Sequence, residues 1–241
     1  MRISPLIPCA VIAFSFAAEA AHAAVPLVAA SNAAAFNMVL NLDGEKTVLG
    51  NQVGVSGHAP PSYNSKTSMP SFSKTYNSPS GASVQMSGGS ITSTASSAGP
   101  SAGQIVSKGQ NAIGSLKAAV GTPLGTLISI TGGNIISRST YTLSRDGTRK
   151  AVGYADIGKV TINAPLLGIN NKSFSGSPKV NQVLYQSPDK SVTVYLNRQV
   201  ETMAAGQPTS ITVDAVAIVF NKAINQLSVG ADIVVGTSMA N

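Results

Sequence analysis

The chain has 241 residues and a formal net charge of +7, although Asp, Glu, Lys and Arg together make up only 10% of it. Intrinsic disorder goes with few apolar residues and a high net charge, so the 43% hydrophobic content argues against a disordered protein. The length is sufficient for one sizeable core, and all-β domains of this size often remain undivided.

The first segment, Met1–Ala23, is typical of a secretory signal peptide. It has a basic residue, Arg2, then an apolar stretch, and it ends in the small-x-small cleavage site Ala21-His22-Ala23. We therefore expect cleavage near Ala23 and a mature protein that is periplasmic, at the cell surface or secreted. Cleavage removes Cys9, and a long exported chain without disulfides fits a bacterial envelope protein.

Residues 24–241 are predicted to form a single β-rich extracytoplasmic domain. Apolar and polar residues alternate over Phe36–Leu42, which predicts a half-buried strand. Asp43-Gly44 predicts a turn, and Thr47–Leu49 can return as the partner strand. The segment His58–Pro79 is rich in Pro, Ser, Tyr and Asn. Because proline removes a donor from the ladder, this composition predicts edge strands and loops.

The next stretch, at about residues 101–120, favours one short helix. Ser101 can cap its start, and Gly121 with Pro123 ends it. The apolar residues that recur at roughly helical spacing are Ile105, Ala112, Ile113, Leu116 and Val120. Three glycines in this stretch each weaken a helix by about 1 kcal/mol relative to alanine.

Strand patterns dominate the rest of the chain and are separated by Gly, Ser, Asn and Pro turns. This arrangement predicts an all-β, antiparallel β-sandwich-like domain. Ile211–Phe220 is apolar on both faces after Asp214 and predicts a central strand. The expected strands are Leu127–Ile130, Ile135–Leu143, Gly153–Ile162, Val180–Tyr185, Val192–Val200, Ile211–Phe220 and Ala231–Val235, after an earlier one that starts at Val84 and is broken or bulged at Gly88-Gly89.

The sequence contains a faint internal repeat. Ser87–Thr94 resembles Thr131–Arg138, which begins 44 residues later, and both contain Gly-Gly-x-Ile. Ala155-Asp156-Ile157 is echoed by Ala231-Asp232-Ile233. Two copies are too few for a solenoid, whereas equivalent hairpins in two sheets would account for them.

These segments together resemble the choice-of-anchor P family of exported bacterial proteins. The resemblance is carried by Pro60–Tyr63, the two Gly-Gly-x-Ile segments, Tyr154–Ile157, Ile211–Val216 and Gly230–Val235. It implies an exported β-rich protein without an established enzymatic activity. Members of the family often carry a C-terminal anchoring element, whereas Gly236–Asn241 shows no sorting signal.

The basic residues are scattered along the sequence, and the densest group is Arg145, Arg149 and Lys150 around Asp146. No Lys/Arg run or basic stripe with interleaved aromatic residues is present, so we expect no nucleic-acid binding. The positive net charge favours, at most, a weak attraction of the protein to anionic polymers of the cell envelope. No later segment reaches the roughly 18 apolar residues that a transmembrane helix requires.

Candidate reactive groups are few. His58 is the only histidine after the signal, and its Gly, Ala and Pro neighbours indicate an exposed loop residue rather than a general base. One histidine and no cysteine cannot supply a zinc-type site, and the acidic residues form no dense loop for calcium. We therefore expect no catalytic, cofactor-binding or metal-binding residues.

Asp156, Asp214 and Asp232 each interrupt an apolar strand pattern. Such aspartates can form the carboxyl pair of a glycosidase, or they can serve the structure by blunting sheet edges or bonding to turns. Tyr154 and Tyr195 are candidate sugar-binding aromatics, because a tyrosine has an apolar ring and a polar tip.

The expected function is therefore that of an exported, non-enzymatic envelope or extracellular protein that contacts surface or matrix polymers. The alternative is a carbohydrate-binding or carbohydrate-active β-sandwich domain that uses these five residues. The two differ in one visible feature, because an enzyme requires a hollow in which two carboxyl groups converge, whereas an adhesive protein requires only a face or an edge.

Overall fold

The computed structural model describes residues 29–42, 45–51, 58–59, 62–77, 81, 83–98, 104–123, 125–221 and 232–241. The predicted signal segment and the turn pair Asp43-Gly44 lie outside these residues, as do Pro60-Pro61 and Ala231. Within the described ranges, no helix has the length and apolarity needed to span a membrane.

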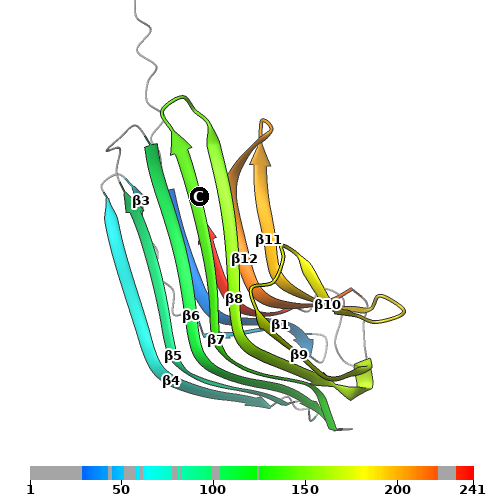
Figure 1. Ribbon diagram of the computed structural model, residues 1–241. Coiled ribbons are helices and arrows are strands. Elements are labelled where there is room, and N and C mark those ends of the chain that lie inside the picture. The colour runs from blue at the N-terminus through cyan, green and yellow to red at the C-terminus, as the bar shows by residue number, and fades with distance from the viewer. Residues whose placement is uncertain are drawn as a thin grey trace, which may run out of the picture.

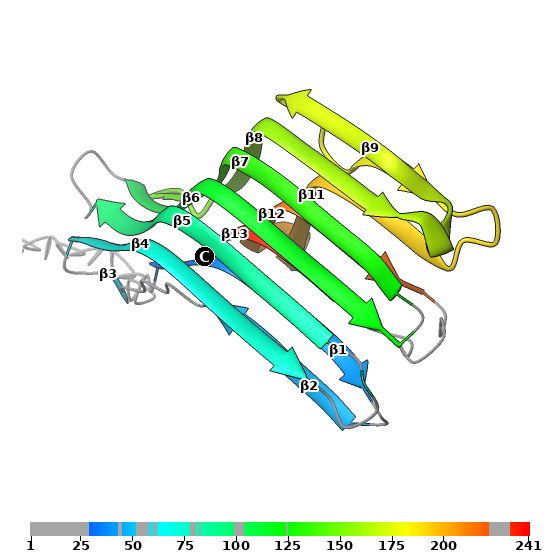
Figure 2. The same ribbon diagram turned by 90° about the horizontal axis from the view of Figure 1, so that it is seen from below.

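Two antiparallel sheets pack face to face, so the prediction of an all-β sandwich-like fold is confirmed (Figures 1 and 2). The six-stranded sheet has the order β4-β5-β6-β7-β8-β9, with β4 Tyr63–Asn77, β5 Ser83–Ala98, β6 Gln104–Thr122, β7 Gly125–Ser144, β8 Arg149–Ala164 and β9 Ile169–Gly176. The seven-stranded sheet has the order β10-β11-β12-β13-β1-β2, and β3 pairs with β1. Its strands are β1 Ala29–Leu42, β2 Glu45–Asn51, β3 His58–Ala59, β10 Gln182–Gln186, β11 Val192–Ala204, β12 Gln207–Phe220 and β13 Asp232–Ala240. A short 3-10 helix, η1 Pro165–Leu167, links β8 to β9.

The predicted helix at about residues 101–120 is wrong, because this segment is the long strand β6. Every second residue from Ile105 to Ile113 is buried, and then every second residue from Leu116 to Val120. The alternation thus slips by one residue between Ile113 and Leu116. This slip produces spacings of three and four between apolar residues, and these imitate the period of a helix.

The slip belongs to a line that crosses five strands, which we call the crease. It consists of Pro70, Ser90, Gly114, Asn134 and Gly158, which lie opposite one another in the registers of β4 to β8. Ser90 and Asn134 adopt left-handed φ values of 55° and 52°. The glycines provide the space, since a Cβ on Gly114 would lie 2.8 Å from Cβ of Ser90, and one on Gly158 would lie 2.7 Å from Cβ of Asn134.

The crease divides the six-stranded sheet into two limbs. The upper limb contains residues 135–144 of β7 and the lower limb contains residues 125–133, together with their neighbours in the sheet. Figure 1 looks onto the upper limb and Figure 2 looks onto the lower limb, because the strands bend at the crease.

The internal repeat is explained by this sheet. β5 and β7 flank β6 in register, so Gly88–Ile91 and Gly132–Ile135 lie at the same level, 44 residues apart. The expectation of equivalent hairpins in two different sheets is therefore wrong for this pair. The second echo does fall in two sheets, since Asp156 lies in β8 and Asp232 in β13.

The seven-stranded sheet has a matching crease at Asn197, Ala215 and Gly236, which are opposite one another in β11, β12 and β13. Asn197 and Gly236 have positive φ values of 50° and 65°. A Cβ on Gly236 would lie 3.5 Å from Cγ2 of Ile135 and 3.8 Å from Cδ1 of Ile113. The two creases therefore face each other, and the sheets bend together.

The interior differs between the two limbs. In the lower limb and at the crease it is filled by large apolar side chains, including Ile128, Ile130, Ile162 and Phe220. In the upper limb many inward residues are small or carry a hydroxyl or amide group. These buried polar residues are Ser93, Ser97, Ser107, Asn111, Ser137, Ser139 and Ser238. Of the described side-chain atoms, the Oγ of Ser97, Ser137 and Ser238 and the Oδ1 of Asn111 are buried without a hydrogen-bond partner.

Other local predictions have mixed outcomes. β1 and β2 pair as the predicted hairpin, the Pro-containing β4 is an edge strand, and β12 is a central strand buried on both faces. His58 was predicted in a loop, whereas it lies in the short strand β3, where its backbone pairs with Ala30 of β1. Leu127–Ile130 and Ile135–Leu143 are two halves of the single strand β7, which continues through the crease.

Candidate functional site

The structure brings two of the three candidate aspartates together. Nε of Arg198 donates to Oδ2 of Asp214 at 2.9 Å, and Nη1 of Arg198 lies 3.6 Å from Oδ2 of Asp232. Thr237 donates its hydroxyl to Oδ1 of Asp214 at 2.8 Å. These residues face away from the core on β11, β12 and β13, so the cluster joins three adjacent strands.

This cluster spans the crease of the seven-stranded sheet. Arg198, Asp214 and Thr237 share one register level next to the crease, whereas Asp232 precedes Thr237 by five residues on β13. Five residues of straight strand would span about 16 Å, more than the reach of the two side chains. The bend at Gly236 brings Asp232 within range of the Arg198 guanidinium.

The two carboxyl groups have different environments. The side chain of Asp214 is only 4% exposed, and it accepts bonds from Arg198 and Thr237. Burial raises the pKa of Asp232, and this effect outweighs the lowering by the more distant Arg198 guanidinium. The guanidinium lies between the two carboxylates, in the space that a sugar would need for acid–base chemistry. The arrangement is that of an ion-pair cluster that supports the fold.

The other candidates lie elsewhere. Tyr154 and Asp156 are on the outer face of β8, and Ser177 links them, donating its hydroxyl to Oδ1 of Asp156 at 3.1 Å and meeting the Tyr154 hydroxyl at 3.0 Å. Tyr195 is half-buried on β11, in the opposite sheet. The five residues that the sequence singled out are therefore split between the two sheets and do not form one site.

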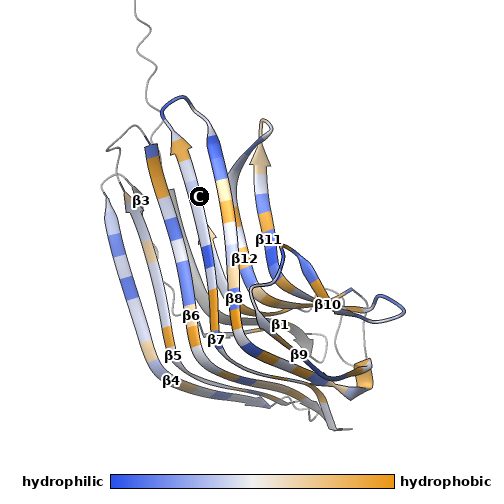
Figure 3. Cartoon of the chain, in the orientation of Figure 1, coloured by the Kyte–Doolittle hydropathy of each residue, from blue (hydrophilic) through white to orange (hydrophobic). Residues whose placement is uncertain are grey.

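The outer face of the six-stranded sheet carries a group of six of the 16 basic residues of the chain. Six basic side chains are exposed there, namely Lys66, Lys108, Lys117, Arg138, Lys150 and Lys159. Lys108, Lys117 and Arg138 each stand between two buried neighbours. Asp156 is the only acidic residue in β4 to β9. We call this surface the cationic face, and Figure 3 shows polar residues recurring along its strands.

Hydroxyl and amide side chains fill the positions between these cations. One level of the lower limb reads Ser73, Ser87, Lys117, Thr131 and Thr161 across β4 to β8. Arg198 on the other sheet pairs with Asp214 and Asp232, whereas none of the six cations of this face forms an ion pair within the described residues. The cationic face thus presents positive charge and neutral hydrogen-bonding groups toward solvent.

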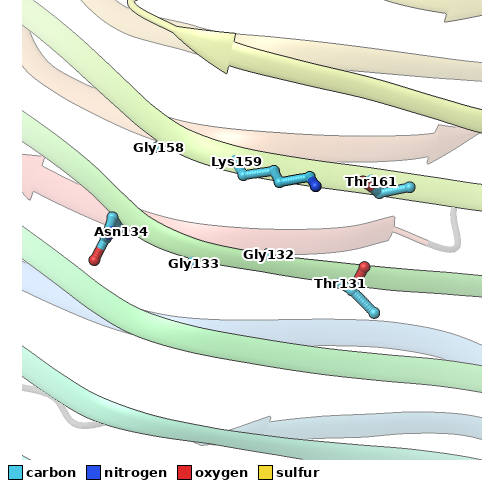
Figure 4. A pocket seen from close by; sticks show the side chains of 7 residues that line it. All are labelled: Thr131, Gly132, Gly133, Asn134, Gly158, Lys159 and Thr161. Carbon is cyan, nitrogen blue, oxygen red and sulfur yellow. The ribbon is translucent and has the colours of Figure 1, made fainter.

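Two hollows lie on the lower limb. The larger, of about 480 Å³, is at the crease and is lined by Thr131, Gly132, Gly133, Asn134, Gly158, Lys159 and Thr161 (Figure 4). The smaller, of about 130 Å³, is lined by residues of β4, β5 and β6 that include Lys74 and Lys117. Neither hollow is lined by a carboxylate. In the described part of the chain, no group of three or more His, Cys, Asp or Glu residues could hold a metal ion.

The sequence interpretation missed the cationic face because its lysines are far apart along the chain. Lys66, Lys108 and Arg138 come together only through the registers of four adjacent strands. The available signal was the alternation of Lys108, Lys117 and Arg138 with residues that are buried, and the predicted helix hid it in β6.

Comparison with protein-family models, with curated proteins and with solved structures gave no match.

Proposed function

We propose that the chain is an exported, non-enzymatic bacterial protein of the envelope or extracellular space that adheres to an anionic surface or matrix polymer through its cationic face. The observation that supports this most strongly is the gathering of six exposed cations on a sheet face with one carboxylate. A surface of one charge sign attracts polymers of the opposite sign over several ångströms. The hydroxyl groups between the cations can bond to sugar or phosphate oxygens at short range.

The proposed export rests on Met1–Ala23, and the resemblance to the choice-of-anchor P family supports the same location. The segregation of charge adds a structural reason for the choice of face. The strands of the seven-stranded sheet contain the acidic residues Glu45, Glu201, Asp214 and Asp232, so the two sheets differ in charge.

Retention of the purified mature chain on immobilised dextran sulfate, compared with neutral dextran, tests the proposal. We expect retention on the sulfated matrix only, and elution as NaCl rises, because salt screens exposed charges. The test variant is Lys108→Glu with Arg138→Glu, since these residues are diagonal neighbours on β6 and β7.

The matched control is Lys179→Glu with Lys190→Glu, two exposed residues outside the cationic face. Both variants lower the net charge equally. The test pair should lose most of the retention and the control pair should keep it. Equal losses would show that net charge alone acts, and would refute a role for this face.

A second candidate function is binding of carbohydrate without catalysis. It is favoured by Tyr154, whose side chain lies on the same face and is 40% exposed, with its hydroxyl held by Ser177. Arg138 is its register neighbour on β7. A glycan array of the mature chain and its Tyr154→Ala variant tests this function. Binding to neutral glycans that Tyr154→Ala removes would favour it over charge-driven adhesion, whereas a uniformly silent array would count against it.

A further inference from the structure

The crease hollow differs from the rest of the cationic face because glycine replaces side chains there. Gly132, Gly133 and Gly158 leave a depression between β7 and β8. A side chain cannot refill it at low cost, since a Cβ on Gly133 would lie 2.8 Å from the carbonyl oxygen of Gly114, and one on Gly158 would lie 2.7 Å from Cβ of Asn134. The bend that forms the crease thus also keeps the hollow open.

The polar groups around the hollow are mixed in kind. Lys159 extends along β8 toward Thr161, and Thr131 stands on the neighbouring strand (Figure 4). Asn134 lies at the other end of the hollow. The Thr161 and Ser173 hydroxyls are 2.9 Å apart, which continues the polar rim onto β9. The lining therefore has one cation, two hydroxyl groups and one amide.

This composition selects a ligand class. One lysine without a carboxylate partner among the described residues suits a ligand with a single negative charge. Hydroxyl and amide groups donate and accept hydrogen bonds, as the hydroxyl groups of a sugar require. A hollow of about 480 Å³ falls within the range of roughly 300–1,000 Å³ that small-ligand sites occupy.

We propose that the crease hollow binds one acidic sugar residue, with Lys159 on the carboxylate and with Thr131, Asn134 and Thr161 on the ring hydroxyls. The inference rests on the proposed function, and it narrows the polymer to an acidic polysaccharide whose uronate units enter the hollow while the cationic face holds the rest of the chain.

The test is a titration of the isotope-labelled mature protein with sodium D-glucuronate, followed by amide chemical shifts. Shifts should concentrate at residues 131–134 and 158–161. D-glucose at the same concentration should produce little change. Lys159→Met keeps the apolar stem but removes the charge, and it should weaken glucuronate binding by about tenfold or more, because hydrogen bonds to charged groups contribute about 1.5–3 kcal/mol.

Lys117→Met is the matched control, because Lys117 is on the same limb but does not line this hollow. It should bind glucuronate as the wild type does. The inference is overturned if glucose binds equally well, if sodium acetate produces the same shifts, or if Lys159→Met has no effect. Failure here with intact retention on dextran sulfate would leave the proposed function standing, because that assay depends on Lys108 and Arg138. Glucuronate binding without retention on dextran sulfate would show a sugar site in the hollow but refute adhesion through the cationic face.

Discussion

The crease makes a specific demand on Gly114, and a double-mutant cycle can measure it. In Gly114→Ala the new Cβ would lie 2.8 Å from Cβ of Ser90 and 3.3 Å from the carbonyl oxygen of Gly89. The Cβ of Ser90 is fixed to the backbone, so rotation of its side chain cannot relieve the contact. Both strands must shift, which costs about 1–3 kcal/mol in a packed region.

One effect opposes this cost. Glycine within a strand is less stable than alanine by about 0.5–1 kcal/mol, because it loses more backbone entropy on folding. The contact is the larger effect, so we expect a net loss of about 1–2 kcal/mol for Gly114→Ala. Ser90→Gly removes the closest obstructing atom, and its positive φ of 55° suits glycine. In the background of Ser90→Gly, the alanine should therefore cost at least about 1 kcal/mol less.

Urea denaturation of the four proteins, followed by far-ultraviolet circular dichroism, gives the coupling free energy. A loss for Gly114→Ala that Ser90→Gly reduces would confirm that the two residues compete for one space. If Gly114→Ala is as stable as the wild type, or if the two changes are simply additive, the contact does not limit the sheet and the explanation of the crease is wrong.

Three further predictions concern the interior and the ion-pair cluster. Arg198→Met should destabilise the fold by about 3 kcal/mol or more in urea denaturation, because it leaves the buried Asp214 carboxylate without its ion-pair partner. Adding Asp214→Asn should recover part of this loss of stability, and no recovery would contradict the assigned pairing. The raised pKa of Asp232 means that its ionised form is disfavoured in the folded protein. This cost is absent below the ordinary pKa of about 3.9 and complete above the raised pKa, so the melting temperature of Asp232→Asn should increase relative to that of the wild type as pH rises through this range. Parallel melting curves of the two proteins against pH would refute this prediction. Ser137→Ala removes a buried hydroxyl without a partner among the described residues and should stabilise the protein by about 1 kcal/mol. Ser93→Ala removes the acceptor of the Asn111 amide at 3.0 Å and should destabilise the protein. The opposite order of the two variants in thermal unfolding would count against both assignments.

Much of the fold was readable from local patterns. Period-two alternation located the β1–β2 hairpin and, over Val192–Leu196, the start of β11, whereas β12 was located by apolar residues on both of its faces. The prolines correctly indicated that β4 is an edge strand.

The errors cluster at the crease. Where β6 crosses it at Gly114, the alternation changes phase, and the apolar residues on either side combine into a helical period. The same interruption split β7 into two predicted strands at Thr131–Asn134. A single sequence does not show that neighbouring strands slip at the same level, and only that shared register makes the interruption compatible with a continuous sheet.

The candidate site was readable only in part. Asp214 and Asp232 were among the candidates from the sequence, but Arg198, which joins them, was not, because the contact depends on the bend at Gly236. Tyr154 and Asp156 lie on the cationic face, whereas the basic residues of that face were regarded as scattered.

The in-register 44-residue hairpin has a consequence for how such a protein can change during evolution. Each unit is one hairpin, β5–β6 or β7–β8, whose first and last residues lie in the lower limb. Each hairpin contributes one pair of residues to the crease, Ser90 with Gly114 in the first and Asn134 with Gly158 in the second. Duplication or deletion of one whole unit would therefore widen or narrow the cationic face by two strands while preserving the bend at the crease.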